Sequence, residues 1–133
     1  MTSDEVFVVD DDESIRRALR RLLQSAGYRV RTFGSAHEVI AEFQDHRPAC
    51  LIVDVRMPGC TGLDLVDTLR RTSATPAVIF ITGHGDGDMA VRAMKAGAVD
   101  FLAKPFDDEA LLAAVAEAVR PVERRTRSPL FRD

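Results

Sequence analysis

Cysteines and long apolar runs are both scarce in this 133-residue sequence. Its two cysteines, Cys50 and Cys60, are too few for a disulfide framework, and they form neither a CxxC pair nor a Cys/His metal spacing. No apolar run approaches the roughly 20 residues that a membrane-spanning helix needs, so we expect no membrane contact. The first residues lack the basic region and apolar stretch of a secretory signal, and a cytoplasmic location is therefore the prediction.

Positive charge is concentrated at the C-terminal end of the sequence. The formal net charge is −3, yet residues 120–133 contain five arginines against Glu123 and Asp133, so the rest of the chain is distinctly acidic. An acidic surface repels nucleic-acid phosphates, and we expect no direct DNA binding by this chain. We interpret residues 1–119 as one folded domain and residues 120–133 as an Arg-rich linker or disordered tail.

Short apolar runs alternate with amphipathic stretches five times along the chain. The runs are residues 6–9, 29–33, 50–53, 77–81 and 99–103. The first, third and fourth are continuously apolar, which is typical of parallel strands buried on both faces. The second alternates and is expected at a sheet edge, while Asp100 interrupts the fifth and brings one face of it to solvent. This pattern predicts an α/β fold, a (βα)5 doubly wound five-stranded parallel sheet with the flavodoxin-like strand order 2-1-3-4-5.

The stretches between the runs carry helix signals. Apolar residues recur at helical period from Ile15 to Ala26, and Gly27 is expected to end this first helix in the left-handed conformation. Its opposite face carries Arg16, Arg17, Arg20 and Arg21. Ser35 with Glu38 predicts a capping box for the second helix. The third helix is expected to begin near Gly62. The fourth is expected to begin within residues 85–88 and to carry the apolar residues Val91 and Met94. The fifth is expected to begin at a cap formed by Asp107 or Asp108.

Polar residues follow the apolar runs at one end. They are Asp10 and Asp11 after the first run, Asp54 after the third, Thr82 after the fourth and Lys104 after the fifth. A doubly wound sheet places its site outside the carboxyl ends of its strands, between strands 1 and 3. Three carboxylates meeting there would repel one another, so a divalent cation is expected, and Mg²⁺ is usual where phosphate is handled. With a lysine and a hydroxyl, this set can hold a transferring phosphoryl group, and Asp54 can be the nucleophile.

Each residue alone also has an ordinary structural interpretation. Asp12 or Glu13 is expected to do no more than cap the first helix. Asp54 could be a solvated loop residue, Thr82 a strand-end hydroxyl and Lys104 a surface lysine. Their joint arrival at one edge of the sheet favours the functional interpretation.

Four segments closely resemble the receiver domain of bacterial two-component response regulators. They are VVDD at residues 8–11, VDVRMPG at 53–59, ITGHG at 81–85 and AVDFLAKPF at 98–106. The resemblance covers about residues 5–119 and looks most like the FixJ-type branch. It implies the CheY-like form of the fold and a phosphorylation-dependent signalling switch that accepts a phosphoryl group from a sensor histidine kinase.

The resemblance also implies roles for single residues. Asp54 matches the phosphoacceptor, Asp11 a direct Mg²⁺ ligand, Asp10 a second acidic residue often acting through water, and the backbone carbonyl of Arg56 the remaining protein ligand. The chain would not be an enzyme beyond intrinsic phosphotransfer and autodephosphorylation. The side chains of Arg56 and His84 would flank the attacking water and set the lifetime of the phosphorylated state, although His84 fits an exposed loop residue equally well.

The signal would leave through a second group of residues. Thr82 matches the hydroxyl that turns toward the phosphoryl group, and Lys104 matches the lysine that pairs with a phosphate oxygen, with a cis bond to Pro105. Phe101 matches an aromatic switch residue, at a position that more often holds tyrosine. The face of helix 4, strand 5 and helix 5 would then repack, and it would form a homodimer on phosphorylation. A DNA-binding output domain follows such receivers in longer proteins, and both a single-domain regulator and a receiver from a longer protein stay open.

Three other functions share parts of this pattern, and each disagrees with particular residues. A haloacid dehalogenase-type phosphatase needs a second Asp two residues after the nucleophile, where this chain has Arg56. A flavodoxin-type electron carrier needs a phosphate-cradling loop after the first strand, where residues 10–12 are all Asp and would repel a phosphate. A degenerate receiver acting only as an interaction module disagrees with the complete set of acidic, hydroxyl and lysine residues.

Overall fold

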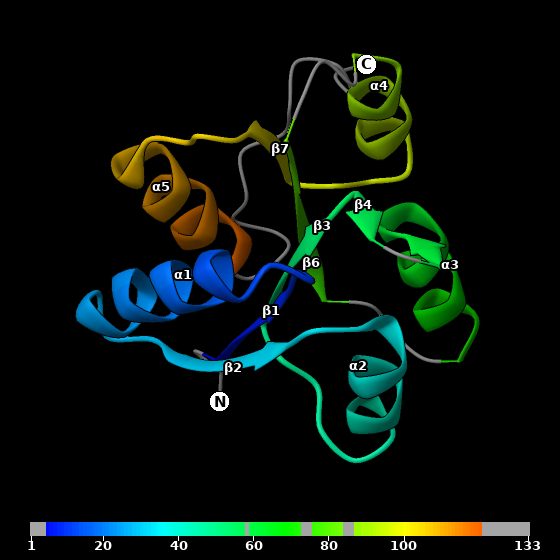
Figure 1. Cartoon of the computed structure of the whole chain (residues 1–133). Coiled ribbons are helices and arrows are strands. Elements are labelled where there is room, and N and C mark those ends of the chain that lie inside the picture. Colours follow the sequence, from blue (N-terminus) through cyan, green and yellow to red (C-terminus); the bar gives the residue numbers. More distant parts are fainter. Residues whose placement is uncertain (1–4, 58, 73–75, 84–86, 121–133) are drawn as a thin grey trace.

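A five-stranded parallel sheet forms the centre of the computed structural model, which describes residues 5–57, 59–72, 76–83 and 87–120 (Figure 1). Its strands are β1 (Glu5–Val9), β2 (Arg29–Phe33), β3 (Cys50–Asp54), β6 (Ala77–Thr82) and β7 (Asp100–Ala103). They lie in the order β2-β1-β3-β6-β7, and every neighbouring pair is parallel. Counted as the five strands of the sheet, this is the predicted order 2-1-3-4-5, so the predicted fold class is confirmed.

Helices cover both faces of the sheet, as Figure 1 shows. Helices α1 (Glu13–Ser25) and α5 (Asp108–Ala118) lie on one face, and α2 (Ala36–Phe43), α3 (Gly62–Thr72) and α4 (Gly87–Lys95) lie on the other. Each face has its own hydrophobic core. Within the described ranges, no helix combines the length and apolar composition needed to cross a membrane.

The alternation of side chains along β1 feeds both cores. Val6 and Val8 belong to the core under α1 and α5, whereas Phe7 and Val9 belong to the core under the other three helices. All five residues of β1 and all five of β3 are buried, because helices cover both faces of these central strands. The strands that carry the acidic residues are therefore anchored by packing on both sides of the sheet.

The burial of residues in the two edge strands and in α4 can be compared with the sequence pattern. β2 exposes Arg29 and Arg31, as expected of an edge strand, and no residue of β7 is fully buried. Of the two apolar residues named for the fourth helix, Met94 packs against the core with Ala93, whereas Val91 is 49% exposed. The apolar residues of this nine-residue helix are spread over more than one side, so the pattern alone does not specify which side is buried.

Short-range hydrogen bonds set the helix ends. Asp12 caps α1 by accepting from the Ser14 N–H at 2.9 Å, and Asp107 rather than Asp108 caps α5 by accepting from the Ala110 N–H at 3.1 Å. Gly27, with φ of 95°, follows the end of α1 in the predicted left-handed conformation.

The second helix has a modified capping box. Ser35 accepts from the Glu38 N–H at 3.4 Å, as expected. The Glu38 carboxylate, however, accepts from the Gly34 N–H at 2.9 Å, one residue before the position of a standard box.

A small hairpin that the sequence did not predict connects β3 to α3. Strands β4 (Arg56–Met57) and β5 (Cys60–Thr61) pair antiparallel, and they bring the chain back to the end of β3. The Gly62 N–H then donates to the Val55 carbonyl at 2.7 Å. A Cβ atom on Gly62 would lie only 2.5 Å from the carbonyl oxygen of Asp54, so α3 begins in direct contact with the backbone that carries Asp54.

Gly62→Ala is expected to lower the free energy of unfolding by about 1–3 kcal/mol, because the new methyl group meets backbone that cannot move aside. Alanine is the better helix former by about 1 kcal/mol, so helix propensity acts in the opposite direction. Urea unfolding monitored by circular dichroism measures the change. Gly83→Ala is the control: a Cβ there meets nothing within 4 Å, and stability should stay within about 0.5 kcal/mol. Equal stability of the Gly62→Ala and wild-type proteins would contradict the close contact.

Candidate functional site

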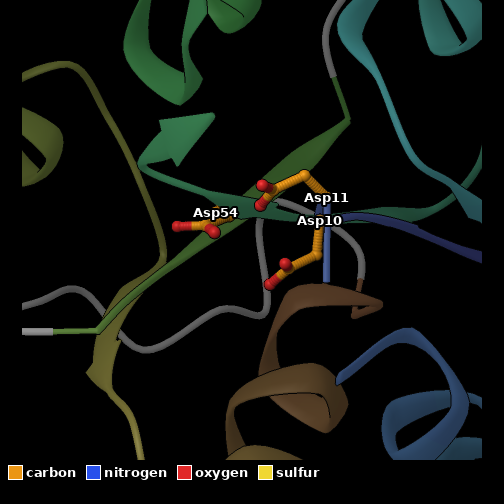
Figure 2. Close-up of side chains that lie close together, drawn as sticks. All are labelled: Asp10, Asp11 and Asp54. Atoms are coloured by element: carbon orange, nitrogen blue, oxygen red, sulfur yellow. The ribbon is translucent and has the colours of Figure 1, made fainter. Parts of the chain in front are cut away.

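Three carboxylates converge at the carboxyl edge of the sheet. Asp10 and Asp11 directly follow β1, and Asp54 is the last residue of the neighbouring strand β3. One oxygen from each side chain can be chosen so that all three lie within 4.8 Å of one another, and Figure 2 shows the side chains approaching one region. Asp10 is fully buried, Asp54 is 5% exposed and Asp11 is exposed. The structure therefore brings together the acidic residues that the sequence singled out.

Lys104 joins two of these carboxylates. Its Nζ donates to Asp10 Oδ2 at 2.9 Å and to Asp54 Oδ2 at 3.4 Å. The other oxygen of each carboxylate accepts from the backbone: Asp10 Oδ1 from the Asp12 N–H at 2.9 Å, and Asp54 Oδ1 from the Arg56 N–H at 3.1 Å. Asp10 and Asp54 are thus held at both oxygens, whereas Asp11 makes no hydrogen bond or ion pair with any described residue.

The acidic pocket contains more negative than positive side chains. Burial raises the pKa of the Asp54 carboxyl; the Arg56 N–H acts against this, and the Asp10 charge adds to the increase. Burial by itself would lower the pKa of Lys104, but its hydrogen bond to Asp10 and the charges of Asp10 and Asp54 outweigh burial and raise that pKa. One ammonium facing three carboxylates leaves net negative charge in the pocket, which favours a bound cation.

Thr82 and Lys104 approach the acidic pocket from the neighbouring strands. Thr82 is the last residue of β6, which lies beside β3, and it is 2% exposed. Its carbonyl accepts from the Lys104 N–H at 2.6 Å, directly after β7. The bond between Lys104 and Pro105 is cis, as the resemblance implies. The sheet therefore places a hydroxyl and an ammonium at the same edge as the carboxylates.

The other residues with predicted roles lie around this centre. Phe101 pairs in register with Phe80 and is half-buried against the core under α2, α3 and α4. The Arg56 side chain is exposed at the start of the β4–β5 hairpin. His84 and the tail at residues 121–133 lie outside the described residues, so the predictions for them stay predictions.

The donor set of the pocket suits a hard divalent cation. The three side chains that converge there offer carboxylate oxygens, which such cations prefer, and Asp11 is exposed and uncommitted. Asp10 and Asp54 can still coordinate, because a carboxylate oxygen that accepts one hydrogen bond retains another lone pair. The acidic pocket of Asp10, Asp11 and Asp54 can therefore hold a metal ion.

Comparison with known proteins agrees with this geometry. The family model of the response regulator receiver domain matches residues 6–116. The chain belongs to this family. Receiver domains are normally not catalytic enzymes, and the membership decides against the phosphatase and electron-carrier interpretations.

Curated relatives of this receiver domain come from longer regulators. Nodulation protein W of Bradyrhizobium diazoefficiens is 51% identical over 120 residues, which cover 90% of this chain and 53% of that protein. The transcriptional regulatory protein FixJ of the same organism is 39% identical over 96% of this chain and 62% of FixJ. The chain thus spans less than two thirds of the length of either relative.

Solved structures show the same fold. The receiver superposes on the crystal structure of FixJ-N with a TM-score of 0.83 and 39% identity, over 96% of this chain and all of that one. A Burkholderia pseudomallei response regulator protein, solved with a phosphorylated aspartic acid, calcium ion and citrate, gives a TM-score of 0.75 and 31% identity. That match covers 84% of this chain and 65% of the other.

Sequence reasoning missed two residues at the receiver site. Gly62, expected only as a helix start, contacts the Asp54 backbone. Arg16, assigned to the solvent face of the first helix, is half-buried, and its Nη1 donates to the Asp10 carbonyl at 2.7 Å. One signal for Arg16 was available, because helical side chains point back toward the N-terminus and Arg16 lies one turn after the Asp12 cap.

Asp54→Asn is expected to stabilise the receiver at neutral pH when EDTA removes divalent cations. The folded-state pKa of Asp54 is raised, so its contribution to stability is complete below its unfolded pKa of about 4 and is lost as pH rises through the folded pKa. Asparagine does not titrate, so the gain should grow from pH 4 to pH 7, to on the order of 1 kcal/mol. Urea unfolding across this range measures it.

Asp45→Asn is the matched control, because it removes the same kind of carboxylate at an exposed position between α2 and β3, outside the acidic pocket. A constant difference in stability between the Asp54→Asn and wild-type proteins would contradict the raised pKa.

Proposed function

We propose that this receiver is a phosphorylation-dependent signalling switch, in which Asp54 accepts a phosphoryl group from a sensor histidine kinase with the help of Mg²⁺. The observation that carries the proposal is the cluster of Asp10, Asp11 and Asp54 within 4.8 Å, with Lys104 donating to two of its members. In the proposed role, Asp54 would be the nucleophile, the three carboxylates would form the cation pocket and Lys104 would be the fixed ammonium.

The transfer itself requires little from the protein beyond positioning and charge. An Asp54 carboxylate oxygen forms the new bond to phosphorus as the bond from phosphorus to the kinase histidine nitrogen breaks, and the imidazole keeps that electron pair. Lys104, 3.4 Å from Asp54 Oδ2, is placed to pair with a phosphoryl oxygen. Asp11, Asp54 and the Arg56 carbonyl would hold Mg²⁺, with Asp10 acting through water. When bound, the ion neutralises charge on the phosphoryl oxygens.

The printed description of the Burkholderia pseudomallei protein supports this chemistry. That regulator carries a phosphorylated aspartic acid and a calcium ion on the same fold, at 31% identity to this chain. A divalent cation and a phosphorylated aspartic acid therefore occur together in the structure of a related response regulator. We extend the same arrangement to Asp54, with Mg²⁺ as the ion in the cell.

In this proposal, the conformational change starts at Thr82 and reaches the surface formed by α4, β7 and α5. Phosphorylation adds strong acceptor oxygens, toward which the Thr82 hydroxyl and Lys104 reorient. Phe101 is half-buried, so it can move between a more exposed and a more buried position as Thr82 leaves space. The face of α4, β7 and α5 changes with it, with Pro105 in the adjoining turn. The outcome is a shift between two populations, biased by a local charge change.

The wider setting follows from the family. We assign the chain a cytoplasmic location, where a kinase can reach it, and activities limited to intrinsic phosphotransfer and autodephosphorylation. Arg56 and His84 would set the rate at which water removes the phosphoryl group. Residues 1–119 act as the receiver and residues 120–133 as a linker. Because the relatives are longer, we propose that a DNA-binding output domain follows in a longer parent protein.

Phosphorylation is tested by incubating the chain with acetyl phosphate or phosphoramidate and measuring intact mass. With Mg²⁺ the wild type should gain one phosphoryl group, and with excess EDTA it should gain almost none, because the pocket then lacks its neutralising charge. Asp54→Asn should not be labelled, whereas Asp45→Asn should match the wild type. An unlabelled wild type, or full labelling of Asp54→Asn, would contradict the proposal.

We also propose that phosphorylation promotes a homodimer through α4 and β7. The supporting observation is Val91, a large hydrophobic residue that α4 leaves 49% exposed close to half-buried Met94. Light scattering should show a monomer that becomes a dimer when beryllofluoride and Mg²⁺ mimic phosphorylation. Val91→Asp should stay monomeric, while Ala18→Asp, on the exposed side of α1, should dimerise. A constant mass for the wild type would overturn the dimer.

A further inference from the structure

Arg16 occupies a corner where three elements of the fold meet. It lies in the first turns of α1, and its guanidinium donates from Nη1 to the carbonyl oxygen of Asp10 at 2.7 Å, at the end of β1. The same guanidinium packs against Gly34 after β2, where a Cβ atom would lie 3.3 Å from Nη1 and 3.6 Å from Cζ. The absence of a side chain at Gly34 leaves the space through which Arg16 reaches the backbone of β1.

The hydrogen bond from Arg16 completes the fixation of Asp10. The Asp10 N–H donates to the Phe33 carbonyl at 3.1 Å, and the two carboxylate oxygens accept from the Asp12 N–H and from Lys104. Arg16 holds the one remaining polar atom, the carbonyl oxygen. Every hydrogen-bonding group of Asp10 is therefore engaged, and a shift of this residue would break several bonds at once.

The consequence reaches Asp11 through the peptide bond. The carbonyl of Asp10 and the Cα of Asp11 belong to one rigid planar unit. A bond that fixes the carbonyl direction therefore also fixes where the Asp11 side chain starts. Asp11 has no hydrogen bond or ion pair of its own with a described residue, so this backbone constraint is what positions it. The constraint leaves its carboxylate oxygens uncommitted and available to a cation.

Arg16 also brings positive charge close to the pocket without entering it. Its guanidinium binds the backbone, whereas Lys104 binds the carboxylate oxygens that a cation would use. Arg16 can therefore reduce the repulsion among the carboxylates without competing for their oxygens. Arg20 lies one turn further along the same helix; its side chain is exposed and makes no hydrogen bond or ion pair with any described residue.

We propose that Arg16 is a positioning residue for the divalent cation site: it fixes the Asp10–Asp11 peptide so that the Asp11 carboxylate is preorganised for the ion. This inference rests on the proposed function, in which the acidic pocket binds Mg²⁺. Partners that orient metal ligands typically change metal affinity about 10–100-fold when they are removed.

The experiment compares the wild-type 133-residue chain with the variants Arg16→Met, Arg16→Lys and Arg20→Met. Each is titrated with Mg²⁺ in metal-stripped buffer, and Kd is read from the amide NMR shifts of residues 10–12. Arg16→Met should bind Mg²⁺ about 10-fold more weakly, because the peptide is no longer fixed. Arg16→Lys, whose ammonium can still donate to the carbonyl, should recover most of the affinity. Arg20→Met, which removes the same charge from the same helix, should match the wild type.

Urea unfolding in EDTA is measured alongside, because a purely structural role would lower stability and leave Kd unchanged. If Arg16→Met does not fold, Arg16→Gln replaces it under the same criteria. If the Arg16→Met variant, or Arg16→Gln in its place, binds Mg²⁺ as tightly as the wild type, the role of Arg16 is overturned. An equal loss of Mg²⁺ affinity in Arg20→Met would overturn it as well. Either result would leave the Mg²⁺ site intact. A wild type that shows no Mg²⁺-dependent shifts would overturn the Mg²⁺ site itself, and the role of Arg16 with it.

Discussion

The repulsion among Asp10, Asp11 and Asp54 is the constraint around which the carboxyl edge of this sheet is organised. Their oxygens approach within 4.8 Å, and carboxylates that close disfavour one another's ionised form. The fold keeps them there by attaching them to two neighbouring strands that are buried on both faces. Lys104 offsets part of the charge, and the remaining negative charge favours a bound cation.

The two hydrophobic cores make this arrangement rigid. Parallel pairing of β1 with β3 sets Val9 beside Val53, so the acidic residues that follow emerge side by side. Substantial motion of either strand would disturb packing on both faces of the sheet. The acidic residues consequently sit on a stiff base, and the less buried elements, β7 and the short helix α4, lie to one side of it.

Two groups of residues surround the acidic pocket: one group connects it to the rest of the sheet, and the other holds the backbone that carries the carboxylates. Lys104 and Thr82 come from strands on the side of β3 away from β1, and they connect the pocket to the face that would carry the signal. Arg16 and Gly62 hold the backbones of Asp10 and Asp54 from the opposite sides of the sheet, and they fix where the carboxylates start. A switch of this kind needs both, because a charge change can move a surface only if the charges themselves stay in place.

Much of the fold was determined by local sequence. Continuous apolar runs identified the buried strands, turn residues such as Gly27 and caps such as Asp12 set the helix ends, and the residues following each strand identified the acidic pocket. These features depend on a residue and its near neighbours, so a sequence can state them. The β4–β5 hairpin, the outward direction of Val91 and the contacts of Arg16 and Gly62 were decided only by the tertiary structure. Each of these depends on how a segment packs against segments that are distant in the sequence. The residue pattern within one segment carries no information about which residues of another segment it will contact.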